Sequence, residues 1–143
     1  KVAVIVGKGF NGAELQTVVN TLKREGIHAE ILSNTLGTVK GSDGVELAVD
    51  QTFLTADSVL FDAVYAVTGS EEDKSFYKKA ALFVYEAFSH FKPIGATQEG
   101  QKLLEVDEMK HSPGVIIEDE PQEFANQFID AIASHRFWNR KVL

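Results

Sequence analysis

Three short polar segments of this sequence contain residue types that could do chemistry. They are residues 7–14, 68–70 and 97–100, and each follows an apolar run typical of a buried strand. In an open parallel sheet, the loops that leave the carboxyl ends of neighbouring strands meet at one edge, where binding and catalytic groups gather. The three segments are therefore predicted to converge on one candidate site.

The first of these segments matches the dinucleotide-binding pattern G-x-G-x-x-G, with Gly7, Gly9 and Gly12 in the three glycine positions. The functional interpretation is a phosphate cradle at the start of a helix. Phe10 is bulky where the backbone would have to approach a pyrophosphate, and Glu30 lies within the second strand instead of at its end. We therefore interpret the glycines as a tight strand-to-helix turn.

The third segment is predicted to be an elbow, in which a strand turns sharply into a helix. On related folds such an elbow presents a nucleophile. Thr97, Gln98 and Glu99 offer no thiolate, and the chain contains no cysteine. Thr97 has a hydroxyl but no obvious base beside it, and His111 is expected in a surface loop. No histidine shows the spacing of a metal ligand, so we predict no metal or cofactor in this segment.

Apolar runs alternate with helical periods, which predicts an α/β fold: a flavodoxin-like three-layer sandwich with a mainly parallel sheet. Residues 39–49 are predicted to add a small β-hairpin about an Asp43-Gly44 turn, and residues 55–61 a loop or short helix. We expect one domain over residues 1–143. The predicted strands are 2–6, 29–32, 63–67, 94–96 and 115–117, and the predicted helices follow Gly12, Ser70, Gly100 and Pro121.

The helix after Ser70 has the clearest apolar stripe. Ser70-x-x-Asp73 is predicted to cap it as a variant of the capping box, with the acidic residues 71–73 at its N-terminus. We interpret the stripe as a core face, in preference to an interface for another domain or an unfolded client. Its members are Phe76, Ala80, Phe83, Val84, Ala87, Phe88 and Phe91.

The charge balance excludes two classes of partner. Lys and Arg number 14 against 21 Asp and Glu, a formal charge of -7, which repels nucleic acid and anionic membranes. No apolar run approaches the ~20 residues of a membrane span, and no basic leader indicates a signal peptide; the compartment stays unknown. Because residue 1 directly precedes a core strand, we expect a domain of a longer chain.

The C-terminal segment 135–140 combines arginine with aromatic residues, namely Arg136, Phe137, Trp138 and Arg140. One interpretation is a helix end that packs on its own domain. The other is a docking patch for another subunit, since arginine and aromatic residues are enriched at interfaces. The sequence leaves both open.

Several of these motifs resemble the class I glutamine-amidotransferase-like superfamily, which includes intracellular proteases and the Parkinsonism-associated deglycase. They are the elbow P-I-G-A-T-Q-E-G, the Gly12-Ala13-Glu14 turn and F-D-A-V-Y-A-V-T-G-S. The chain more closely resembles the C-terminal domain of large-subunit haem catalases. The residues that carry this resemblance are L-G-T-V-K-G-S-D-G-V-E-L, D-Q-T-F-L-T-A-D-S-V-L-F-D-A-V-Y and H-R-F-W-N-R, and it runs through essentially the whole chain.

The resemblance implies a vestigial site without catalytic residues. The acidic partner of the superfamily's nucleophile corresponds to Glu14, and the nucleophilic cysteine corresponds to Gln98, with Glu99 next to it on the elbow. The two glycines of the oxyanion loop correspond to Gly69 and Ser70. Since the acid is retained and the nucleophile is lost, we predict that Glu14 hydrogen-bonds the Gln98 amide or nearby backbone.

The resemblance also implies a parent enzyme. Large-subunit catalases disproportionate hydrogen peroxide at a haem in a separate upstream β-barrel domain, which would supply every haem ligand. Here Tyr65, Tyr77 and Tyr85 are predicted to be core or helix residues. The leading hypothesis is a non-catalytic accessory domain that contacts its own catalase core and the sister subunits of a homotetramer. A chaperone-like module that binds unfolded clients is the second, and a free-standing hydrolase, disfavoured by the lack of cysteine, is the third.

Overall fold

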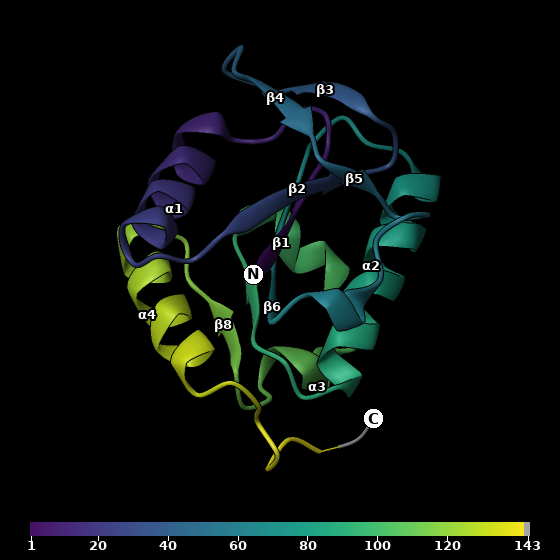
Figure 1. Cartoon of the computed structure of the whole chain (residues 1–143). Coiled ribbons are helices and arrows are strands. Elements are labelled where there is room, and N and C mark those ends of the chain that lie inside the picture. Colours follow the sequence, from purple (N-terminus) through teal and green to yellow (C-terminus); the bar gives the residue numbers. More distant parts are fainter. Residues whose placement is uncertain (142–143) are drawn as a thin grey trace.

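A parallel six-stranded sheet forms the middle layer of the computed structural model, which describes residues 1–141 (Figure 1). The strand order is β5-β2-β1-β6-β7-β8. Because β1 lies between β2 and β6, the strand order changes direction there, where open α/β sheets place their sites. The strands are β1 (Val2–Val6), β2 (Ala29–Ser33), β5 (Gln51–Thr52), β6 (Ala63–Thr68), β7 (Ile94–Ala96) and β8 (Val115–Ile117).

Helices cover both faces of the sheet, as the flavodoxin-like prediction requires. Helices α1 (Gly12–Arg24) and α4 (Pro121–Ala133) cover one face, on the left in Figure 1. The other face is covered by α2 (Lys74–Ser89), α3 (Asp107–Lys110) and the 3₁₀ helices η1 (Ser58–Leu60) and η2 (Gln98–Leu103). No helix within residues 1–141 is long and apolar enough to cross a membrane.

The alternation of side chains along β1 explains why its sequence is apolar throughout. Val2, Val4 and Val6 pack in the core beneath α1 and α4, whereas Ala3 and Ile5 pack in the core beneath α2. All five side chains are fully buried. A strand covered on both faces needs an unbroken apolar run, which confirms the interpretation of residues 2–6.

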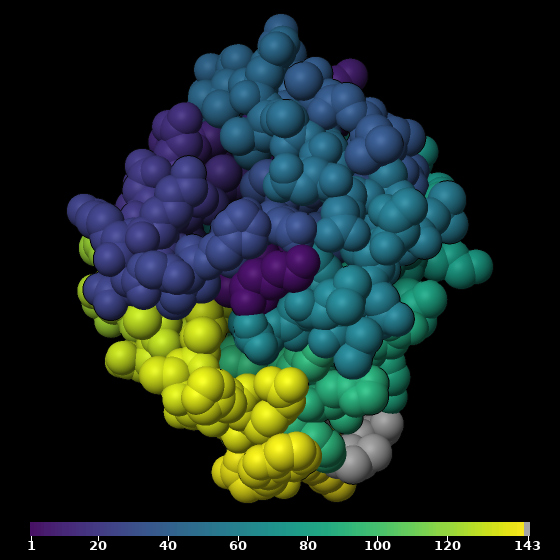
Figure 2. Space-filling model, in the orientation of Figure 1, coloured from purple at the N-terminus to yellow at the C-terminus, as the bar shows by residue number. Residues whose placement is uncertain are grey.

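The predicted hairpin is present, and it lies over the carboxyl end of the sheet, at the top of Figures 1 and 2. Strands β3 (Gly37–Lys40) and β4 (Glu46–Val49) pair antiparallel as a separate small sheet. Ser42 N donates to the Phe10 carbonyl at 2.8 Å, and the Asp43 carboxylate accepts from Ala13 N at 3.1 Å. The hairpin therefore holds the loop between β1 and α1 in place.

The start of α2 differs from the prediction. The N-cap is Asp73, whose carboxylate accepts from Phe76 N at 2.9 Å, and Ser70 lies outside the helix. The backbone before Asp73 is bonded instead to the loop after β1, where Glu71 N donates to the Lys8 carbonyl at 3.0 Å. This tertiary pairing delays the helix by one turn.

The predicted apolar stripe of α2 is buried except for its last member. Phe91 lies beyond the helix, with a φ of 64°, and its ring contacts that of Trp138 at 5.3 Å between centroids. The sequence pattern also does not indicate β5, because Gln51 and Thr52 are polar and the strand has only two residues. Residues 55–61 contain η1, within the predicted loop or short helix.

Arg140 anchors the C-terminal segment to its own domain. It is only 4% exposed, and it donates to the Pro113 carbonyl from Nε at 3.0 Å and from Nη2 at 2.7 Å. Its Nη1 donates to the Phe88 carbonyl at 2.8 Å, and its guanidinium lies 4.4 Å from the Phe88 ring centroid. Burial lowers the pKa of Arg140 to about 10, so the side chain stays charged at neutral pH. Trp138 of the same segment is 73% exposed.

We expect Arg140→Met to lower the free energy of unfolding by about 3 kcal/mol, because two buried carbonyls lose a charged donor. Arg136→Met is the matched control, since Arg136 donates to the carbonyl of the adjacent His135; it should cost less than about 0.5 kcal/mol. Urea denaturation of both variants measures the difference. Equal losses would show that Arg140 does not anchor the segment.

Candidate functional site

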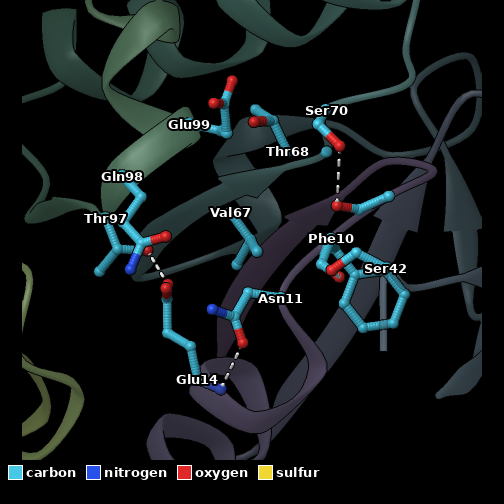
Figure 3. A pocket seen from close by; sticks show the side chains of 12 residues that line it. Phe10, Asn11, Glu14, Ser42, Val67, Thr68, Ser70, Thr97, Gln98 and Glu99 are labelled. Atoms are coloured by element: carbon cyan, nitrogen blue, oxygen red, sulfur yellow. Dashed lines mark hydrogen bonds between the residues drawn. The ribbon is translucent and has the colours of Figure 1, made fainter. Parts of the chain in front are cut away.

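The three predicted segments meet at the carboxyl edge of the sheet and line a half-open cavity of about 220 Å³ (Figure 3). This confirms that they converge. The first loop supplies an acid and an amide, and segment 68–70 supplies two hydroxyls. The elbow supplies a hydroxyl, an amide and a second acid. The lining residues are Gly9, Phe10, Asn11, Glu14, Ser42, Val67, Thr68, Gly69, Ser70, Thr97, Gln98 and Glu99.

Glu14 is the buried acid of this cavity, with 4% of its surface exposed. It lies in the first turn of α1, where the Asn11 side chain caps the helix by accepting from Glu14 N at 3.1 Å. Its Oε1 accepts hydrogen bonds from the hydroxyls of Tyr65, at 3.0 Å, and Thr97. These hydroxyls are the partners of the Glu14 carboxylate, in place of the Gln98 amide or nearby backbone that we expected. Gln98 lies past the end of β7 and is exposed.

Tyr65 belongs to the site although the sequence analysis assigned it only to the core. Its ring packs on Phe124, with 4.9 Å between centroids, while its hydroxyl reaches Glu14. Burial raises the pKa of Tyr65 well above its usual value, and the neighbouring Glu14 carboxylate raises it further, so the hydroxyl remains a donor. The alternation along β6 was the available signal, because it places Tyr65 on the face that α1 covers.

The elbow at Gln98 has a strained backbone that is packed tightly against the sheet. Gln98 has a φ of 39°, a conformation that side chains rarely adopt. A Cβ on Gly100 would lie 1.8 Å from the Ala66 carbonyl oxygen, so the backbone of the elbow packs directly against β6. Glu99 pairs with Lys102 on the same turn, at 2.6 Å.

Thr97 does have a carboxylate beside it, which corrects the expectation that no base accompanies this hydroxyl. Its proton is donated to Glu14, and its oxygen lies 3.4 Å from the Tyr65 hydroxyl. Only 1% of Thr97 is exposed. The hydroxyl is therefore a structural bridge between α1 and the end of β7, not a group presented to a substrate.

The hydrogen-bond donors of Ser70, in the loop after β6, bond to another loop of the protein. Ser70 N and Ser70 Oγ both donate to the Gly9 carbonyl, at 3.4 and 3.3 Å, and the Tyr77 hydroxyl donates to the Gly69 carbonyl at 2.9 Å. A Cβ on Gly69 would lie 2.2 Å from the Lys8 carbonyl oxygen, so this glycine is required for close packing. The donors of Ser70 are thus already engaged, which leaves them unsuited to stabilise an oxyanion.

The glycine-rich first loop is a turn and not a phosphate cradle. The amides of Gly7 and Gly9 donate to backbone carbonyls at 3.2 and 2.9 Å. The Glu72 carboxylate accepts from Lys8 N at 2.7 Å, so a negative charge already lies against the loop. This arrangement opposes a phosphate and confirms the interpretation as a strand-to-helix turn.

The histidines lie away from the cavity. His111 is exposed, as predicted, with Nε2 4.0 Å from the Asp107 carboxylate. His28, His90 and His135 are also exposed. Among residues 1–141, no group of three or more acidic or histidine side chains could hold a metal ion.

A family model described as the C-terminal domain found in long catalases matches residues 1–142. The chain belongs to this family. This catalase C-terminal domain is 47% identical over 140 residues, or 98% of the chain, to a catalase of Alkalihalophilus pseudofirmus. It is 46% identical over 146 residues to Catalase-2 of Bacillus subtilis, which covers 99%. The chain spans 21% of the length of each of these relatives.

Solved structures share the fold of the catalase C-terminal domain at low sequence identity. A ThiJ/PfpI domain protein of Brachyspira murdochii superposes with a TM-score of 0.79 at 17% identity, covering 93% of this chain and 95% of that one. Schizosaccharomyces pombe DJ-1 superposes with a TM-score of 0.68 at 15% identity, covering 94% of this chain and 95% of that one. A deglycase of Pyrococcus horikoshii is 30% identical over 105 residues, or 73% of this chain and 63% of that protein.

We expect Tyr65→Phe to lower stability at neutral pH by about 1–2 kcal/mol, because Glu14 loses a buried donor. The raised pKa of Tyr65 means that the folded chain keeps a proton above pH 10 that the unfolded chain loses. Stability should therefore fall as pH rises above about 10, and the fall should be shallower in Tyr65→Phe. Urea titrations at a series of pH values measure both effects.

A double-mutant cycle of Tyr65→Phe with Glu14→Gln provides the control. If the hydrogen bond is as the structure shows, the two single losses should not add in the double variant. Strict additivity, or an unchanged alkaline slope in Tyr65→Phe, would contradict the assignment.

Proposed function

We propose that this catalase C-terminal domain is a non-catalytic accessory domain of a longer haem catalase, which supports the stability or assembly of a homotetramer. One observation carries the proposal. At the elbow the chain presents the amide of Gln98 where the superfamily is expected to present sulfur, and the retained acid, Glu14, is bonded to internal hydroxyls. A rigid scaffold without a nucleophile suits a structural role.

The chemistry of the parent is proposed to lie outside this chain. The two bacterial relatives are named as catalases, and the matched region is 21% of their length. Haem does not fit the residues present here. The cavity of about 220 Å³ is far smaller than a haem macrocycle, and the buried Tyr65 hydroxyl, a possible axial ligand, donates to Glu14. We therefore propose that the haem of the parent and its peroxide chemistry belong to the rest of the longer chain.

A free-standing hydrolase of the superfamily is not supported. The chain has no cysteine to provide the thiolate, and Thr97 is held by Glu14. The donors of Ser70 are engaged by the Gly9 carbonyl, so the oxyanion loop is also incomplete.

Removing residues 1–143 from the longer catalase tests the accessory role. We expect peroxide turnover per haem to stay within about twofold, while the tetramer dissociates and inactivates at a lower temperature. Gln98→Ala in the full-length enzyme is the control, and it should change neither property. Unchanged tetramer stability after the deletion would contradict the proposal, as would lost turnover at full haem content.

A second candidate function is favoured by an apolar groove of about 300 Å³ between α2 and the segment that contains η2 and α3. Leu82 is 60% exposed at its wall, beside Val106, and Met109 lies at its base. Exposed apolar surface of this kind suits the binding of unfolded clients. The remaining lining residues are Lys78, Ala81, Tyr85, Leu103 and Glu105.

For this second candidate we expect the chain, in excess, to delay aggregation of a heat-denatured client, measured by light scattering. Leu82→Gln should weaken the protection several-fold, because it places an amide on the wall of the groove. Leu36→Gln is the control, since Leu36 is equally exposed but lies outside the groove. Absence of protection by the unmodified chain would remove this function.

A further inference from the structure

The cavity at the sheet edge retains polar atoms that the accessory role does not use. Thr68 Oγ1 is fully buried and has no hydrogen-bond partner among residues 1–141. The backbone at Thr68 has a φ of 56°, which is strained for a β-branched residue. A buried hydroxyl without a protein partner at a polar cavity is uncommon, and it can accept a hydrogen bond from a bound molecule.

Glu14 offers a second free acceptor to the same cavity. Both of its hydrogen bonds from described residues are made to Oε1, from Tyr65 and Thr97. Within residues 1–141 its Oε2 receives none, and Figure 3 shows the Glu14 side chain reaching from α1 toward the elbow. The amide of Gln98 lines the cavity as well and adds a carbonyl oxygen.

The charged residues that line the cavity are all acidic. Glu14 and Glu99 are both present, and the twelve lining residues include no lysine, arginine or histidine. Glu99 is paired with Lys102, but no cation among the described residues pairs with Glu14. A buried carboxylate without a positive partner is costly, and the two hydroxyls offset this cost only in part. A cation in the cavity would stabilise it.

The size of the cavity limits the ligand. At about 30 Å³ for each water-sized group, 220 Å³ holds roughly seven such groups. The free acceptors on Glu14, Thr68 and Gln98 call for a ligand with several donors. Anions are repelled by Glu14, and neutral amides gain hydrogen bonds but no ion pair.

We propose that this cavity binds a small organic cation rich in N–H donors, an amidinium or primary ammonium compound of roughly four to seven heavy atoms. One N–H group would donate to Glu14 Oε2 and another to Thr68 Oγ1. The site is independent of the accessory role, so the loss of either proposal leaves the other intact.

Three probes of nearly equal size and shape test the charge requirement: acetamidinium, acetamide and acetate. Each is titrated into the 143-residue chain at constant ionic strength and followed by NMR shifts of residues lining the cavity. We expect saturable shifts with acetamidinium and a Kd on the order of 1 mM, as suits so small a ligand. Acetamide should bind at least tenfold more weakly, and acetate should not bind. Equal binding of the three, or no saturable shift with acetamidinium, overturns the proposal.

Variants test the two acceptors. Glu14→Gln keeps the shape and removes the charge, and it should weaken acetamidinium binding at least tenfold. Thr68→Val keeps the β-branched shape and removes the hydroxyl, and it should weaken binding several-fold. Glu46→Gln is the charge-matched control, because Glu46 is exposed on the hairpin; it should leave the Kd unchanged. If Glu14→Gln does not fold, Thr68→Val decides, and an unchanged Kd in that variant contradicts the proposal.

Discussion

One buried carboxylate links the three parts of the site. Glu14 projects from the first turn of α1. Its Oε1 accepts hydrogen bonds from the hydroxyls of Tyr65 in β6 and Thr97 at the end of β7. A carboxylate in such a place must be hydrogen-bonded, because desolvation of its charge is costly. The hydrogen bonds of Glu14 therefore connect α1 to β6 and to the end of β7.

The backbone geometry of the elbow next to this carboxylate does not by itself fix which side chain stands there. The strained backbone at Gln98 and the close packing of Gly100 on β6 occur here with an amide side chain at the elbow. Schizosaccharomyces pombe DJ-1 has the same fold at only 15% sequence identity. Fold alone therefore does not assign function, and the site residues must.

The β3–β4 hairpin and the C-terminal segment with Arg140 bond to opposite ends of the domain. The hairpin at the carboxyl edge bonds to the loop after β1, and Asp43 accepts from the first turn of α1. At the other end, Arg140 donates hydrogen bonds to the backbone carbonyls of Pro113 and Phe88, and its guanidinium lies over the Phe88 ring. The match to the catalase family extends over both segments, which are as much a part of the domain as its sheet.

Five of the six strands, the hairpin, most of the core stripe of α2 and the convergence of the three loops could be predicted from the sequence, because these follow from the local period of apolar residues. Only the tertiary structure decided the rest. The N-cap moved from Ser70 to Asp73 because the preceding backbone pairs with another loop. The partners of Glu14 depend on which strands lie side by side and which face each residue shows, and the pattern within one strand carries no information on its neighbour.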